Sequence, residues 1–134
     1  MIWRYSLNEL EIAPPSVVRQ AISDFAYALA ETSQFKSFEQ AEDRLRKDNQ
    51  AQQALSAYQT KWRSLEGLIR LNALGSDDQQ ELERLRQAYI TEPSVLAYVQ
   101  AQADLVEVCQ AAGNLISQAT CLNFATVCGS GCCG

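Results

Sequence analysis

Apolar residues recur every three to four positions along most of this chain of 134 residues. No stretch alternates apolar and polar residues with the period of two that is typical of a strand. The first apolar stripe follows Pro14-Pro15 and continues to about Glu31. Because proline is tolerated in the first turn of a helix and not deeper, we expect a helix to begin near this pair. The periodicity therefore predicts an all-α protein.

The longest apolar stripe follows Ser37, and neither Pro nor Gly interrupts it before Gly67. We therefore predict one long helix over residues 37–73. Ser37 is its expected N-cap, and Gln40 is the second member of a capping box. The apolar positions of the stripe are Phe38, Ala41, Leu45, Ala51, Leu55, Tyr58, Trp62, Leu65 and Ile69.

Two more helices are predicted after this one. Gly75 is expected to end the long helix, and Ser76 to cap a shorter one. After Pro93, apolar residues at helical spacing predict a second long helix over residues 94–124. The expected fold is an elongated antiparallel helical hairpin or bundle with two long helices and two shorter ones, followed by a Cys/Gly-rich C-terminal tail.

The chain is expected to form a single helical domain over residues 1–126. Residues 1–13 are interpreted as an N-terminal tail or docking segment, and residues 127–134 as the Cys/Gly-rich tail. Each helix of so thin a hairpin buries only one stripe, which leaves little core per residue. We therefore expect a homo-oligomer, either a dimer or a tetramer. Tyr58 and Trp62 are assigned to the core or to the oligomer interface.

The composition excludes several classes of function. The chain has no His, which excludes Ser-His-Asp and Cys-His catalysis and His-ligated zinc. Its net charge of −5 disfavours direct binding to nucleic acid. Its carboxylates alternate with Lys, Arg and Gln, as on a solvated helix face, and the basic cluster Arg44, Arg46 and Lys47 suits salt bridges or a partner contact.

The predicted location is cytoplasmic. No apolar run approaches the roughly 20 residues that span a bilayer. The N-terminal residues also lack the charged-then-apolar layout of a signal peptide. We therefore expect no association with a membrane.

The cysteines are unevenly placed, since four of the five fall in the last 14 residues. Thiolates bind soft metals and iron–sulfur clusters, so Cys128, Cys132 and Cys133 are candidate cluster ligands. If the last helix continued to Cys128, Cys121 would lie on the same face two turns earlier and would be a candidate fourth ligand. A partner chain is the other candidate source of that ligand.

Two alternative interpretations of the tail stay open. The vicinal pair Cys132-Cys133 suits reversible thiol–disulfide chemistry, as in a redox relay or sensor. The tail Gly131-Cys-Cys-Gly134 is similar to the mobile redox tail of some thioredoxin reductases. Alternatively, the tail has no specific function. Cys109 lies on an apolar stripe and is assigned to the core.

The middle of the chain carries a recognisable pattern of turns and helix starts. It reads Thr32-Ser-Gln-Phe-Lys-Ser-Phe38, then Ala41-Glu-x-x-Leu-x-x-Asp-x-x-Ala51, and later Thr91-Glu-Pro-Ser-Val-Leu-Ala-Tyr98. This pattern resembles the YlbF/YmcA family of small helical bacterial proteins over roughly residues 17–125.

The resemblance implies an all-α, oligomeric regulatory adaptor without enzymatic activity of its own. Members of that family join related regulatory proteins in a complex linked to RNA processing, competence, sporulation and biofilm formation. Iron–sulfur clusters are associated with that complex through cysteines, some of them near C-termini. The resemblance thus supports Cys128, Cys132 and Cys133 as ligands, although not every member has a Cys-rich ending.

Overall fold

The computed structural model describes residues 15–127, and these residues form six helices and no strand. The helices are α1 (Pro15–Ala30), α2 (Ser33–Lys47), α3 (Asn49–Arg70), α4 (Ser76–Ile90), α5 (Pro93–Thr120) and α6 (Phe124–Val127). The predicted all-α class is confirmed for this part of the chain.

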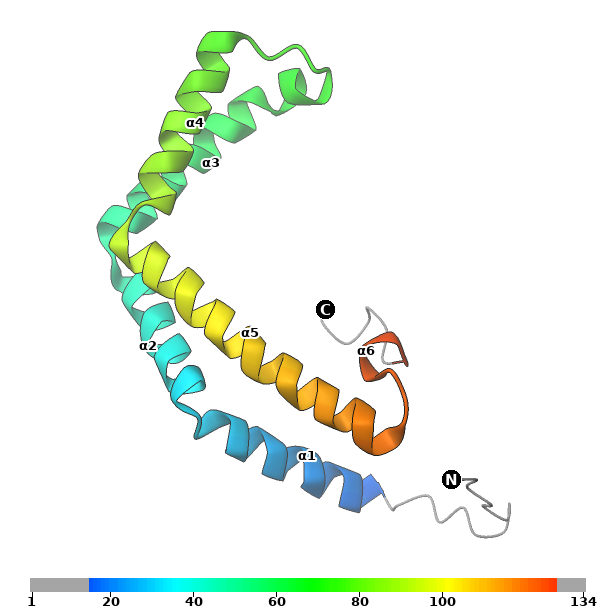
Figure 1. Ribbon diagram of the computed structural model, residues 1–134. Coiled ribbons are helices and arrows are strands. Elements are labelled where there is room, and N and C mark those ends of the chain that lie inside the picture. Colours follow the sequence, from blue (N-terminus) through cyan, green and yellow to red (C-terminus); the bar gives the residue numbers. More distant parts are fainter. Residues whose placement is uncertain (1–14, 128–134) are drawn as a thin grey trace.

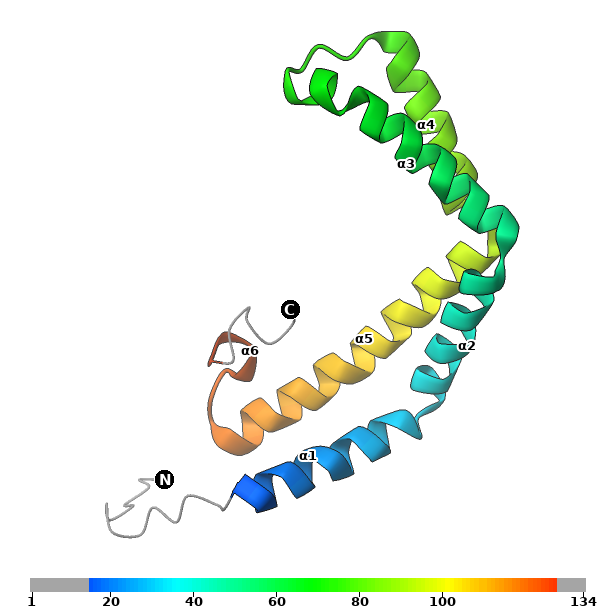
Figure 2. The same ribbon diagram turned by 180° about the vertical axis from the view of Figure 1, so that it is seen from behind.

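The molecule is a bent pair of helical hairpins (Figure 1). One arm is formed by α3 and α4, which pack against each other, and the other by α2 packed against α5. The two arms meet where α2 passes into α3 and α4 passes into α5, and α1 extends beyond α2 along the second arm (Figure 2). We call the meeting point the elbow.

The predicted single helix over residues 37–73 is wrong, because Asp48 divides it into α2 and α3. Asp48 has non-helical backbone angles (φ −80°, ψ 95°), and its side chain accepts a hydrogen bond from the Ala51 backbone N–H at 3.2 Å. Aspartate is a favoured N-cap because its carboxylate satisfies a free N–H of the first turn. The five residues from Arg46 to Gln50 are all polar, and that gap in the apolar stripe marks the break.

Three predicted caps are also corrected. The N-cap of α2 is Thr32, five residues before Ser37; its Oγ1 accepts from the Phe35 N–H at 3.2 Å and donates to the Leu29 carbonyl at 2.6 Å. Asn72 in the left-handed region (φ 52°) follows α3, so Gly75 does not end that helix. Gly75 is instead the N-cap of α4, and Ser76 is the first residue of that helix.

The last long helix begins as predicted but ends at Thr120, a few residues early. Cys121 follows it in the left-handed region (φ 55°), a conformation that terminates a helix. The chain then turns, and α6 packs back against α5.

The core is thin. Among residues 15–127, the buried apolar side chains are Ala51, Leu65, Val95 and Ala101. Between α2 and α5, the rings of Phe38 and Tyr98 lie with their centroids 5.4 Å apart. Each helix therefore buries part of one side, and large apolar side chains remain exposed on α1, α3, α5 and the segment that follows α5.

Candidate functional site

The best-defined polar site is the elbow, where one carboxylate joins three helices. The Asp48 Oδ1 accepts from the Ala51 N–H at the start of α3, and the Asp48 Oδ2 accepts from the Ser94 hydroxyl of α5 at 2.6 Å. Ser94 and Ala51 are both fully buried. The hydrogen bond from Ser94, followed by that from the Ala51 N–H, lowers the pKa of Asp48 below its usual value. The elbow is therefore held by an ionised, fully engaged carboxylate.

A second side-chain contact crosses the elbow nearby. The Gln50 amide donates to the Glu92 carboxylate at 3.3 Å and so links α3 to the residue that precedes α5. The elbow residues coincide with two of the sequence motifs, since Asp48 and Ala51 close one motif and Ser94 lies in another. In these two motifs, the three residues form a structural joint.

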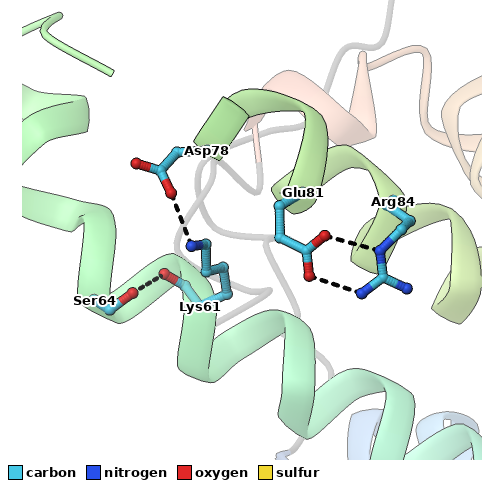
Figure 3. Close-up of polar contacts among 5 residues, drawn as sticks. All are labelled: Lys61, Ser64, Asp78, Glu81 and Arg84. Atoms are coloured by element: carbon cyan, nitrogen blue, oxygen red, sulfur yellow. Dashed lines mark hydrogen bonds and ion pairs between the residues drawn. The ribbon is translucent and has the colours of Figure 1, made fainter. Parts of the chain in front are cut away.

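The arm of α3 and α4 is fastened by an ion pair. Figure 3 shows Lys61 of α3 directed toward Asp78 of α4, with the Nζ 2.8 Å from the Oδ1. Both side chains are partly buried. On α4 itself, Arg84 binds Glu81 through two hydrogen bonds of 2.8 and 2.7 Å, and these lower the pKa of Glu81. Asp77 and Glu83 of this arm are exposed.

The basic cluster of α2 forms local ion pairs. Arg46 and Lys47 bind the two oxygens of Asp43 at 2.8 and 2.7 Å. The hydrogen bond from Lys47, and then that from Arg46, lowers the pKa of Asp43. This arrangement agrees with the expected salt-bridge role of the cluster.

The predicted cluster ligands are only partly within the described residues. Cys128, Cys132 and Cys133 lie outside them. Cys121 is exposed, and its thiol makes one weak contact, at 3.9 Å, with the Gln118 carbonyl. Over residues 15–127, no three Cys, Asp or Glu side chains are grouped to hold a metal ion.

The structure corrects two of the geometric expectations for cysteines. Because α5 ends at Thr120 and the chain turns at Cys121, no continuous helix places Cys121 and Cys128 on one face. Cys109 is exposed and does not belong to the core that residues 15–127 form. It lies in the middle of α5, on a side that the α2–α5 packing leaves uncovered.

The largest unexplained feature is the exposed apolar surface. Helix α1 is amphipathic, yet its apolar side chains are largely open to solvent, and Ile22 is 61% exposed. Helix α5 is apolar on two sides, of which one packs on α2, while Leu96, Val99 and Val106 remain exposed. Trp62 on α3 is 38% exposed.

The uncovered side of α5 was missed at the level of sequence, because all its apolar residues were assigned to a single stripe. A signal was nevertheless present. Apolar residues spaced three and four apart form one stripe at positions 96, 99, 103 and 106. A second stripe, on another side of the helix, contains Tyr98, Ala101 and Leu105. One helix with two such stripes has two sides to cover.

The chain can be compared with known proteins at this point. A family model described as control of competence regulator ComK, YlbF/YmcA, matches residues 18–120. This range contains nearly all of α1 to α5 and ends immediately before Cys121. No curated protein and no solved structure gives a significant match. No helix of the described residues is both long and apolar enough to cross a membrane.

Proposed function

We propose that this chain, which belongs to the YlbF/YmcA family, is a non-enzymatic cytoplasmic adaptor that regulates by binding other proteins. The family match over five helices is the observation that carries the proposal. The open apolar sides of α1 and α5 support it, because exposed apolar patches mark contact surfaces. The partners are a second copy of the chain, in a dimer or tetramer, and related regulatory proteins in a hetero-complex.

The proposed regulatory role is tested by complementation in the native host. Deletion of the gene is expected to change the level of the competence regulator that the family's description names, ComK. Wild type restores this level, whereas Ile22→Glu with Phe25→Glu, which charges the apolar side of α1, does not. The matched control, Ser16→Glu with Ser23→Glu, adds the same two charges on the polar side of α1, where both serines are exposed, and is expected to restore the level. Full activity of the Ile22→Glu/Phe25→Glu variant would contradict a binding role for α1.

We further propose that the C-terminal thiols hold an iron–sulfur cluster. The candidate ligands are Cys128, Cys132 and Cys133, with Cys121 or a partner thiol as the fourth. An all-thiol donor set is the one that such clusters use, and the exposed Cys121 at the end of α5 is compatible with it. When bound, the cluster would supply electron transfer or redox sensing.

Anaerobic purification tests this proposal. We expect iron, acid-labile sulfide and visible absorbance in the wild type, and their loss in Cys132→Ser. A colourless protein that stays free of iron after reconstitution would overturn the proposal. If mild oxidation then lowered the mass of the terminal peptide by about 2 Da, reversibly with dithiothreitol, the vicinal pair would instead be a thiol redox relay or sensor.

A further inference from the structure

One side of α5 forms an apolar seam that nothing in the described chain covers over most of its length. We define the α5 seam as Leu96, Val99, Ala103 and Val106. Leu96 and Val99 are each 55% exposed, and Val106 is 45% exposed. Their spacing of three and four places them on one side of the helix, in successive turns. The side that packs on α2 is different and includes the buried Ala101.

The seam has the pattern of a helix–helix contact. Apolar residues that repeat every three and four positions let two helices pack side chains into each other's gaps. The pattern of positions continues through Gln110 and Gly113 to Ser117. Ser117, on the continuation of this line beyond the seam, already contacts a helix, because the Phe124 N–H at the start of α6 donates to the Ser117 hydroxyl at 3.1 Å. The four residues of the seam are left without such a cover.

The charges of α5 restrict what can cover the seam. Over its 28 residues the helix has two charged side chains, Asp104 and Glu107, and no basic one. Neither carboxylate belongs to the seam. A partner with a basic surface would be attracted to the side that holds Asp104 and Glu107, whereas the seam itself suits an uncharged helical stripe.

A second copy of the chain offers such a stripe. We propose that the α5 seam pairs with the α5 seam of a second copy, in a two-fold symmetric contact. The same patch meets itself in such a contact, so both sides are uncharged and of matching spacing. The small Ala103 lets the two helices approach closely.

This inference rests on the proposed self-association and assigns its surface. The test is sedimentation analysis of the reduced full-length protein, comparing wild type with Val99→Glu/Val106→Glu. Both valines are about half exposed, so the variant is expected to keep the circular dichroism of the wild type. The mass of its assembly is expected to fall at least twofold. The control variant, Ala111→Glu/Gln118→Glu, adds the same charge at exposed positions away from the seam and is expected to keep the wild-type mass.

A second readout uses the native cysteines. Cys109 follows Val106 by three residues and borders the seam, whereas Cys121 lies beyond the end of α5. Paired seams are expected to slow the alkylation of Cys109 in the wild type, and the Val99→Glu/Val106→Glu variant to restore it, with Cys121 reacting alike in both. If the wild type assembles and the Val99→Glu/Val106→Glu variant has the same assembly mass, the seam is not the contact surface, although the chain does self-associate. A monomeric wild type would overturn both.

Discussion

At the scale of single residues, the structure depends on Asp48. This residue ends α2, caps α3 and accepts a hydrogen bond from Ser94 of α5, so it fixes the point where the two arms meet. Two helices joined by a single non-helical residue could adopt many relative orientations if no side chain fixed the joint. The buried Ser94 hydroxyl, paired with Asp48, gives the elbow a defined geometry.

Removal of the Ser94 hydroxyl is expected to weaken the elbow. Ser94→Ala deletes a hydrogen bond to a charged group and is expected to lower the free energy of unfolding by about 2 kcal/mol, the usual cost for such a bond. Asp48→Ala is expected to cost more, because it also removes the N-cap of α3 and leaves the buried hydroxyl unpaired. Urea denaturation followed by circular dichroism measures both. Equal free energies of unfolding for the wild type and Asp48→Ala would contradict the role of Asp48 in stabilising the elbow.

The same carboxylate predicts a dependence on pH. The pKa of Asp48 is lower in the folded than in the unfolded chain, and the pKa of an unperturbed aspartate is about 3.9. Its contribution to stability is therefore complete above that value and is lost as the pH falls through the folded pKa. The Asp48→Asn side chain cannot ionise. Its thermal unfolding midpoint is therefore expected to fall less than that of the wild type between pH 5 and pH 2. An identical acid profile would contradict the role of the ionised form.

At the scale of helices, the sequence predicted the starts of α1 and α5 well because proline marks both. It failed at Asp48, since the apolar period continues in phase across the break and only the polar run from Arg46 to Gln50 signals it. It failed at Cys109 for a different reason. An apolar helix position indicates burial against something, and the sequence does not say whether the cover comes from the same chain or from another.

Helix α3 contains a glycine, Gly67, which is expected to lower the stability of the helix. Gly67 lies in the last turns of α3, and nothing stands within 4 Å of the position that a Cβ would take. Gly67→Ala is therefore expected to raise the free energy of unfolding by up to about 1 kcal/mol, since alanine is the better helix former. Thermal unfolding measures the change. A lower midpoint would mean that another surface packs against Gly67 in the assembled protein.

At the scale of the whole molecule, residues 15–127 form a bent scaffold that leaves many large apolar side chains exposed. Its core is limited to a few side chains at the elbow and along the two arms. The sequence predicted a thin core, and the exposed side of α1 agrees with it; α5 exposes a second apolar stripe that the sequence analysis did not predict. The candidate cluster ligands stay a prediction from the sequence, because Cys128, Cys132 and Cys133 lie outside the described residues.

The central claim is that one copy of the chain is incomplete and acts through surfaces that other proteins cover. Light scattering on the reduced wild-type protein, over a range of concentrations, tests it most directly. The account predicts a particle at a whole-number multiple, two or four, of the 14.9 kDa chain mass. A fully folded particle of 14.9 kDa at every concentration would contradict it.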